Sequence, residues 1–123
     1  MSIVQIQPPL KVPKAWGQET VITNNEKYCG KILTFNPNST FSMHYHMLKD
    51  ETWYVVSGEF SLHWIDTDVA KSYVNKLKIG DVIHIKRGQP HKLVTVTGGS
   101  IFEVSTEHYD DDSYRILPGD SQQ

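Results

Sequence analysis

Apolar and polar residues alternate with a period of two along most of the chain, and this pattern predicts strands rather than helices. Seven segments of four to seven residues are rich in β-branched and aromatic types: residues 29–35, 41–46, 51–56, 59–65, 82–85, 91–96 and 100–105. Turn-forming residues separate these segments at intervals of about 8 to 12 residues. No long window has the spacing of an amphipathic helix. We therefore predict an all-β sandwich or barrel.

The length limits the domain organisation. With 123 residues, the chain has room for one domain. No repeat, low-complexity tract or linker-like composition divides it, so we predict a single domain over residues 1–123. Within it we expect an N-terminal arm over residues 1–18, a barrel over residues 28–105 and a C-terminal extension over residues 106–123.

Charge and cysteine content restrict the partners and the location. The formal net charge is −2 and the basic residues are scattered, which argues against a nucleic-acid partner. No apolar run reaches the roughly 20 residues that a membrane-spanning helix needs. The first fifteen residues lack an apolar signal-peptide core and Cys29 is the only cysteine, so we expect a cytoplasmic protein. Exposed edges of an open barrel favour pairing, and a homodimer is the expected assembly.

Six histidines are many for so short a chain, and two of them stand two apart in an expected strand. The side chains of His44 and His46 then share one face, with Cα atoms about 6.5 to 7 Å apart, so both can reach one ion. The next turn is long enough to return Glu51 to the same place, and His91 is a candidate fourth ligand. Such a set suits one divalent ion, Mn, Fe, Co, Ni or Zn. The alternative is a pair of surface histidines on an edge strand.

The spacing of these residues resembles that of the cupins. Their first motif, G(X)5HXH(X)3-4E(X)6G, is matched from its first histidine onward by His44, His46, Glu51 and Gly58. Their second motif, G(X)5PXG(X)2H(X)3N, is matched by Gly80, Gly88 and His91. Three motif positions differ, because they hold Asn38, Lys86 and Thr95. The resemblance implies an antiparallel double-stranded β-helix, or jelly-roll barrel, with a metal site formed by the three histidines and Glu51.

A narrower resemblance concerns one group within that family. Residues 14–19, 31–33, 42–58, 103–105 and 111–115 are similar to the C-terminal cupin domain of type II mannose-6-phosphate isomerases. That domain commonly has glutamine at the position of His44 and arginine at the position of Lys49. The resemblance implies a metal-dependent isomerase that acts on a sugar or sugar phosphate.

Three further polar residues are candidates for catalysis. Glu103 lies in a β-rich stretch, where it is either a base inside the barrel or a glutamate on the solvent face. Lys31 shares a face with Leu33, where a lysine is costly unless paired, so it either binds a substrate phosphate or lies at the surface. Lys49 stands at the expected barrel mouth, as a catalytic residue or as a solvated turn lysine.

Two residues are weaker candidates for substrate binding. Arg115 can clamp a phosphate bidentately, or it can pair with a neighbouring aspartate. Tyr54 is a candidate platform for a sugar ring, or a core or dimer-surface residue. The remaining histidines fall outside the ligand pattern and are predicted to be structural: His63, His84 and His108.

Three functions are compatible with these residues. The first is a metal-dependent aldose–ketose isomerase that moves a proton between C1 and C2 of a sugar or sugar phosphate through an enediolate. The second is an Fe(II)-dependent dioxygenase that uses the same three histidines and one glutamate. The third is a non-catalytic sugar-binding or regulatory protein. The resemblance favours the isomerase.

Overall fold

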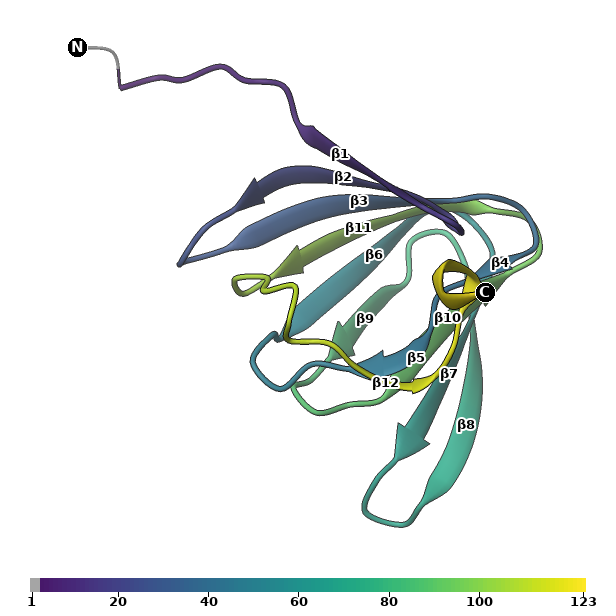
Figure 1. Cartoon of the computed structure of the whole chain (residues 1–123). Coiled ribbons are helices and arrows are strands. Elements are labelled where there is room, and N and C mark those ends of the chain that lie inside the picture. Colours follow the sequence, from purple (N-terminus) through teal and green to yellow (C-terminus); the bar gives the residue numbers. More distant parts are fainter. Residues whose placement is uncertain (1–2) are drawn as a thin grey trace.

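The computed structural model describes residues 3–123, which form twelve strands and one short 3₁₀ helix (Figure 1). The strands are β1 (Leu10–Lys14), β2 (Gly17–Asn24), β3 (Cys29–Phe35), β4 (Ser39–Thr40), β5 (Met43–Tyr45), β6 (Glu51–Gly58), β7 (Phe60–Asp66), β8 (Lys71–Leu77), β9 (Val82–Ile85), β10 (His91–Thr95), β11 (Gly99–Ser105) and β12 (Tyr114–Leu117). The 3₁₀ helix η1 spans Asp120–Gln122. Within residues 3–123, no helix is long and apolar enough to cross a membrane.

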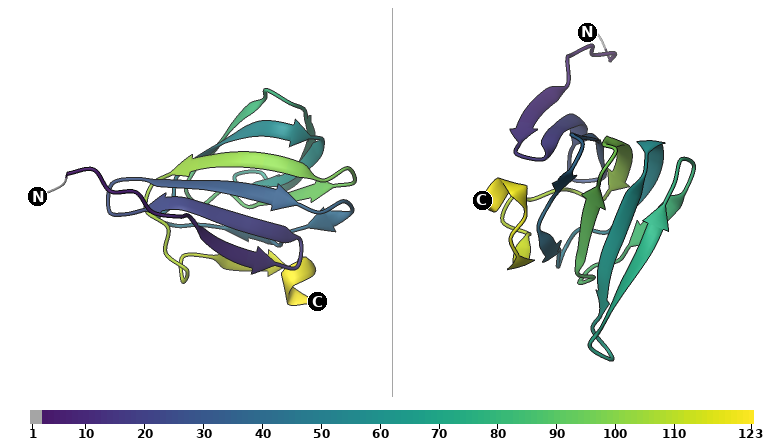
Figure 2. Two further views of the ribbon diagram at one scale, coloured as in Figure 1. Left: turned by 90° about the horizontal axis from the view of Figure 1, so that it is seen from above. Right: turned by 90° about the vertical axis from the view of Figure 1, so that its right-hand side faces the viewer.

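The strands form two antiparallel sheets that face each other (Figure 2). The first sheet has the order β1-β2-β3-β11-β6-β9, and the second has the order β12-β5-β10-β7-β8, with β4 also paired to β10. Both sheets also pair strands that are distant in sequence, such as β3 with β11 and β5 with β10, which is the connectivity of a jelly roll. The predicted all-β jelly-roll barrel is therefore confirmed.

One layer of side chains between the sheets makes the apolar core. In the first sheet, Ile101 lies opposite Leu33 on one side and Val55 on the other, and all three are buried. Aromatic rings fill the space toward the second sheet, with Trp16 and Phe35 stacked at 4.5 Å between centroids. The other buried core residues are Phe41, Trp53, Phe60, Leu62, Leu77, Ile85 and Leu93. The strand alternation thus places apolar groups in the middle of the barrel.

A second layer, two residues further along the same strands, is polar. Glu103 lies opposite Lys31 on one side and Trp53 on the other. Because side chains two apart in a strand share a face, Glu103 and Lys31 point into the barrel like the core residues beside them. Both are buried. This layer forms the floor of the candidate site.

The N-terminal residues belong to the first sheet. Residues 10–18, within the expected arm, form β1 and the start of β2, and β2 pairs with β3. The first two residues of that arm lie outside the described part of the chain. At the other end of the chain, the Ser121 hydroxyl accepts a hydrogen bond from the Ala15 amide (3.2 Å), so η1 lies against the β1–β2 turn. The two terminal segments therefore meet beside the barrel.

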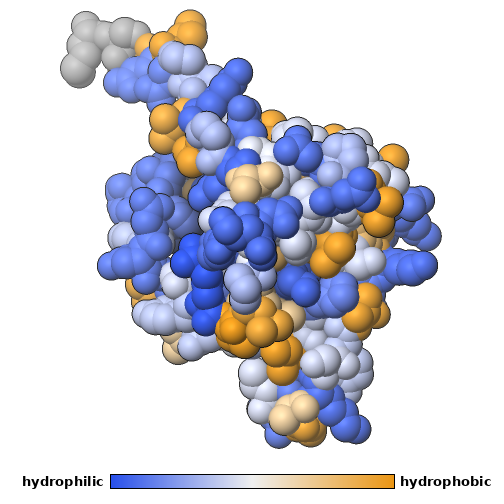
Figure 3. Space-filling view, turned by 45° about the vertical axis from the view of Figure 1, so that its right-hand side comes forward, coloured by the Kyte–Doolittle hydropathy of each residue, from blue (hydrophilic) through white to orange (hydrophobic). Residues whose placement is uncertain are grey.

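The face of the molecule drawn in Figure 3 is mostly polar. Figure 3 shows apolar side chains in small separate groups among hydrophilic ones on the face in view. On the outer side of the first sheet, several apolar residues are exposed: Tyr54, Val56, Val82 and Val104. The β7–β8 hairpin extends from the body of the barrel (Figure 1), and six of the seven β8 residues are exposed.

Candidate metal centre

Three histidines converge inside the barrel. His44 lies in β5, His46 follows it, and His91 begins β10 directly opposite His44. One potential ligand nitrogen from each of the three lies within 4.8 Å of the others. The i, i+2 spacing and the β5–β10 pairing together account for the convergence.

The hydrogen bonds of the three rings leave one nitrogen of each ring available. Nδ1 of His44 donates to the Ser42 carbonyl (2.7 Å), and Nδ1 of His91 donates to the Gln89 carbonyl (2.8 Å). Nδ1 of His46 donates to the carbonyl of Asp112. Since a carbonyl can only accept, the neutral ring carries its proton on Nδ1 and its lone pair on Nε2. Backbone carbonyls orient metal-bound histidines in this way.

Burial also favours the neutral imidazoles that a metal requires. Burial lowers the pKa of His91 to about 3. Burial, followed by the charges of the other two histidines, holds the pKa of His44 well below its usual value. The pKa of His46 is lowered by burial and then by the charge of Lys49. All three rings are therefore uncharged at neutral pH and ready to ligate.

Glu51 lies beside the histidines but outside the set of mutually close ligand atoms. Its Oε2 is 3.5 Å from Nε2 of His46, and its Oε1 accepts a hydrogen bond from the Trp53 indole. Oε2 is buried and has no hydrogen-bond partner among residues 3–123. Nζ of Lys49 is 3.8 Å from this oxygen, too far for a hydrogen bond. A buried carboxylate oxygen without a hydrogen bond is costly, and a metal ion bound to it would remove that cost. The residues present therefore fit a divalent ion.

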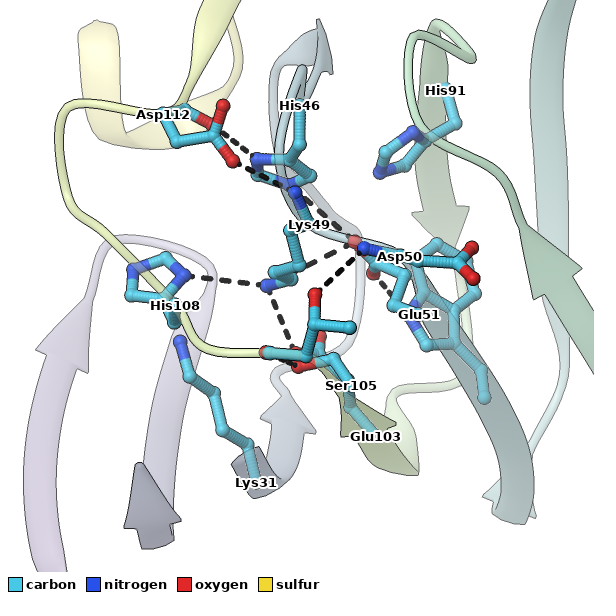
Figure 4. Close-up of polar contacts among 12 residues, drawn as sticks. Lys31, His46, Lys49, Asp50, Glu51, His91, Glu103, Ser105, His108 and Asp112 are labelled. Atoms are coloured by element: carbon cyan, nitrogen blue, oxygen red, sulfur yellow. Dashed lines mark hydrogen bonds and ion pairs between the residues drawn. The ribbon is translucent and has the colours of Figure 1, made fainter. Parts of the chain in front are cut away.

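Lys49 is buried at the centre of a network of ion pairs, as Figure 4 shows. Its Nζ is 2.9 Å from Oε2 of Glu103 and 3.8 Å from Oε2 of Glu51. Burial alone would lower the pKa of Lys49, but the charges of Glu103 and Glu51 outweigh it and raise the pKa. Lys49 is therefore a fixed cation, and the expectation of a solvated turn lysine is not met.

Glu103 and Lys31 both point into the same cavity. Burial, followed by the charge of Glu51, raises the pKa of Glu103, although Lys49 opposes the change. Nζ of Lys31 is 3.0 Å from Oε1 of Glu19, and this pair satisfies the buried lysine. Of the alternatives left open by the sequence, the structure places both Glu103 and Lys31 on the interior face.

His108 is a cavity residue that the sequence pattern did not identify. Nζ of Lys49 donates to Nδ1 of His108 (3.3 Å), and Nε2 of His108 donates to Oδ1 of the exposed Asp110 (3.1 Å). The residue lies in the connection after β11, where strand periodicity carries no information. Its position three residues beyond Ser105, at the end of a strand that leads into the site, is the only sequence signal for it.

The two weaker candidates lie in different places. The cavity has a volume of about 560 Å³, and Arg115 of β12 lines it at the exposed rim. Tyr54 lies between Trp53 and Val55 in β6, and those two face inward with 1% and 0% exposure. Tyr54 therefore points to the outer face of the sheet with 44% exposure, and the structure does not bring it to the cavity.

The fold and the histidine cluster together define a small β-barrel of the cupin type whose three clustered histidines could hold a metal ion. The family profile described as "Cupin domain" matches residues 31–106, more than half of the chain. The chain belongs to the cupin family. No curated protein matches the sequence.

Solved structures with the same fold are larger proteins. The capsular polysaccharide assembling protein CapF from Staphylococcus aureus aligns with a TM-score of 0.80 at 19% identity, over 91% of this chain and 32% of that chain. Oxalate decarboxylase from Bacillus subtilis aligns with a TM-score of 0.77 at 14% identity, over 88% of this chain and 30% of that chain. The formate complex of the Lactobacillus farciminis enzyme gives a TM-score of 0.76 at 16% identity, over 88% and 34%. This chain spans about a third of these proteins, and the likeness concerns the fold.

Proposed function

We propose that this protein is a metal-dependent aldose–ketose isomerase that acts on a sugar or sugar phosphate. The observation that carries the proposal is the buried carboxylate of Glu103. It lines the same cavity as the three histidines and has a raised pKa. An isomerase needs a base that takes a proton from one carbon and returns it to the next, and such a base works best when its pKa lies near the working pH.

His44, His46 and His91 would hold one divalent ion, with Glu51 as the neighbouring carboxylate. The candidates are Zn, Mn, Fe, Ni and Co, which all accept imidazole nitrogen and carboxylate oxygen. When bound, the ion supplies Lewis acidity toward neighbouring oxygens of the substrate.

The other polar residues have distinct roles in this proposal. Glu103 shuttles the proton between C1 and C2. Lys49, 2.9 Å from Glu103, keeps its positive charge and stabilises the negative charge that develops on the sugar. Lys31, inside the cavity, and Arg115, at its rim, are the cations that would attract a phosphate group.

The charges within the cavity support an anionic ligand. Four basic and four acidic side chains line the cavity, with a net charge of 0 when all are ionised: Lys14, Lys31, Lys49, Arg115, Glu19, Glu51, Glu103 and Asp110. A divalent ion changes this balance to +2, so the loaded site favours a negatively charged substrate. A sugar ligand also agrees with the description of CapF as a capsular polysaccharide assembling protein.

The test is proton exchange at the carbon next to the carbonyl carbon, which is C2 in an aldose and C1 in a ketose. Protein loaded with Mn²⁺ or with redox-inert Zn²⁺ is incubated in D₂O with mannose 6-phosphate, fructose 6-phosphate or related sugars, beside an oxygen electrode. We expect deuterium at C2 of the aldose and at C1 of the ketose with either metal, and no oxygen uptake, because no electron leaves the metal in an isomerisation.

The other outcomes identify the alternatives. Oxygen uptake without deuterium incorporation would contradict the isomerase and indicate the Fe(II)-dependent dioxygenase. No reaction with any of these sugars, with one ion bound per chain, would contradict the isomerase and indicate a sugar-binding or regulatory protein.

A further inference from the structure

Asp112 precedes β12, far from the histidines in sequence, yet its side chain holds the turn that follows His46. The carboxylate is buried and accepts hydrogen bonds from three consecutive backbone amides. Oδ1 accepts from Met47 (2.8 Å) and Leu48 (3.1 Å), and Oδ2 accepts from Leu48 (3.2 Å) and Lys49 (3.0 Å). These amides lower the pKa of Asp112 although burial opposes the change. Bonds to a charged acceptor are stronger than neutral ones.

The main chain of the same residue contacts a metal-ligand candidate directly. The Asp112 carbonyl accepts the Nδ1 proton of His46 (Figure 4), so Nε2 is the nitrogen that this ring has left for a metal ion. The turn that the carboxylate holds connects His46 to Glu51, and it carries Lys49. One residue therefore sets the orientation of His46 and the backbone course between His46 and Glu51.

The opposite side of this turn has its own contacts. The His46 carbonyl accepts the Gly88 amide (2.6 Å), and Nε of Arg87 donates to the Leu48 carbonyl (2.6 Å). These bonds fix carbonyl groups, whereas the three amides at residues 47–49 are all satisfied by one carboxylate. Without that carboxylate, the amides would lose their shared acceptor and the turn would have to move.

We infer that Asp112 is the positioning residue of the metal centre. It acts through His46 and through the turn to Glu51, and it does not touch the ion. The inference rests on the proposed metal site and extends it to a residue of the C-terminal segment. Residues that orient metal ligands typically change metal affinity by 10- to 100-fold when they are replaced.

The experiment compares Asp112→Asn with Asp111→Asn, a matched change at an exposed neighbour. Asparagine keeps the shape but turns an NH₂ group toward backbone amides. We expect Asp112→Asn to weaken Co²⁺ binding by about 10- to 100-fold and to alter the visible absorption of the Co²⁺-loaded protein. In metal-free protein, the amide resonances of Met47, Leu48 and Lys49 should shift. Asp111→Asn should match the wild type in all three readouts.

Unchanged affinity and absorption in folded Asp112→Asn would overturn the inference. If that variant fails to fold, Asp112→Ser replaces it, because a hydroxyl adds no opposing NH₂ group and can satisfy only part of the set of amides. Wild-type affinity in folded Asp112→Ser would equally overturn the inference. If wild-type protein takes up no Co²⁺, the proposed metal site is wrong, whereas unshifted amides in the metal-free variant would show that Asp112 does not position the turn.

Discussion

At the scale of single residues, the ion pair of Glu19 with Lys31 links the chemistry of the cavity to its stability. The Lys31 side chain is only 5% exposed, and the pair joins β2 to β3 at 3.0 Å. The charge of Lys31 and its hydrogen bond lower the pKa of Glu19, against the effect of burial. A carboxyl group with a lowered pKa stabilises the folded protein above the unfolded value of 4.5 and loses this effect as the pH falls further.

Glu19→Gln should therefore destabilise the protein in a pH-dependent way. At pH 7 we expect a loss of about 1–3 kcal/mol in the free energy of unfolding, because buried Lys31 loses its charged acceptor. The difference from the wild type should shrink as the pH falls below 4.5. Urea unfolding of both proteins at pH 7, 5 and 4 measures this difference. A difference that stays constant with pH would contradict the assignment.

Glu103→Gln tests the proposed base. Losing one positioned base typically lowers the rate by about 10²- to 10⁴-fold, so kcat for the isomerisation should fall by this factor. Metal uptake should persist, since the clustered ligand candidates are three histidines and Glu103 is not part of that cluster. Steady-state kinetics and elemental analysis on the same preparation provide both readouts. Unchanged kcat would exclude Glu103 as the base.

At the scale of elements, the strands that line the core were predictable and the exposed strands were not. Residues 29–35 and 82–85 were predicted with the bounds that the structure gives to β3 and β9. Over residues 31–35 of β3 and throughout β9, more buried and less buried positions alternate, and this period of two creates the sequence signal. β8 was missed because six of its seven residues are exposed, so neither face has to be apolar.

The candidate site divides in a similar way. His44 and His46 stand two residues apart in one strand, so the sequence alone predicted that their side chains share a face. The inward placement of Glu103 depends on the register with β3 and β6, and strand period alone leaves two faces open. His108 and Asp112 lie in connections, and only the folded chain brings them to Lys49 and His46.

The end of β6 contains a backbone contact that requires glycine. Gly58 has φ +82°, and a Cβ atom there would lie 2.0 Å from the Gly98 carbonyl oxygen. Gly88 has φ +77° but open space around the same position. Both alanine substitutions incur the left-handed backbone cost of about 1–2 kcal/mol. Gly58→Ala should cost about 1–3 kcal/mol more, because the two strands must separate.

Denaturant unfolding of Gly58→Ala and Gly88→Ala checks this difference. The comparison removes the backbone contribution, since both residues have a similar positive φ. Equal stabilities of the two variants would show that β6 and the 98–99 turn do not approach as closely as the structure indicates.

At the scale of the whole molecule, the outer face of the first sheet suggests how copies of the chain associate. At the β9 edge of this sheet, Tyr54 of β6 lies opposite both Phe102 of β11 and Val82 of β9. Tyr54 is 44% exposed and Val82 is 67% exposed, and contiguous apolar groups on a surface favour association.

The homodimer remains a prediction. Sedimentation of the wild type should show a dimer at micromolar concentrations. The Tyr54→Glu variant should shift the equilibrium toward the monomer, because it places a charge on the apolar face. A wild-type protein that is monomeric at all micromolar concentrations would exclude the dimer.

The proposed metal centre requires that one divalent ion binds to His44, His46 and His91 inside the barrel. The most direct measurement is a calorimetric titration of metal-free protein with Co²⁺ or Zn²⁺ at pH 7.5, for the wild type and for His46→Ala. Half-buried His63, which does not line the cavity, gives the control His63→Ala. We predict one ion per chain for the wild type and for His63→Ala, and no saturable binding for His46→Ala. Equal stoichiometry and affinity in the wild type and His46→Ala would contradict the account.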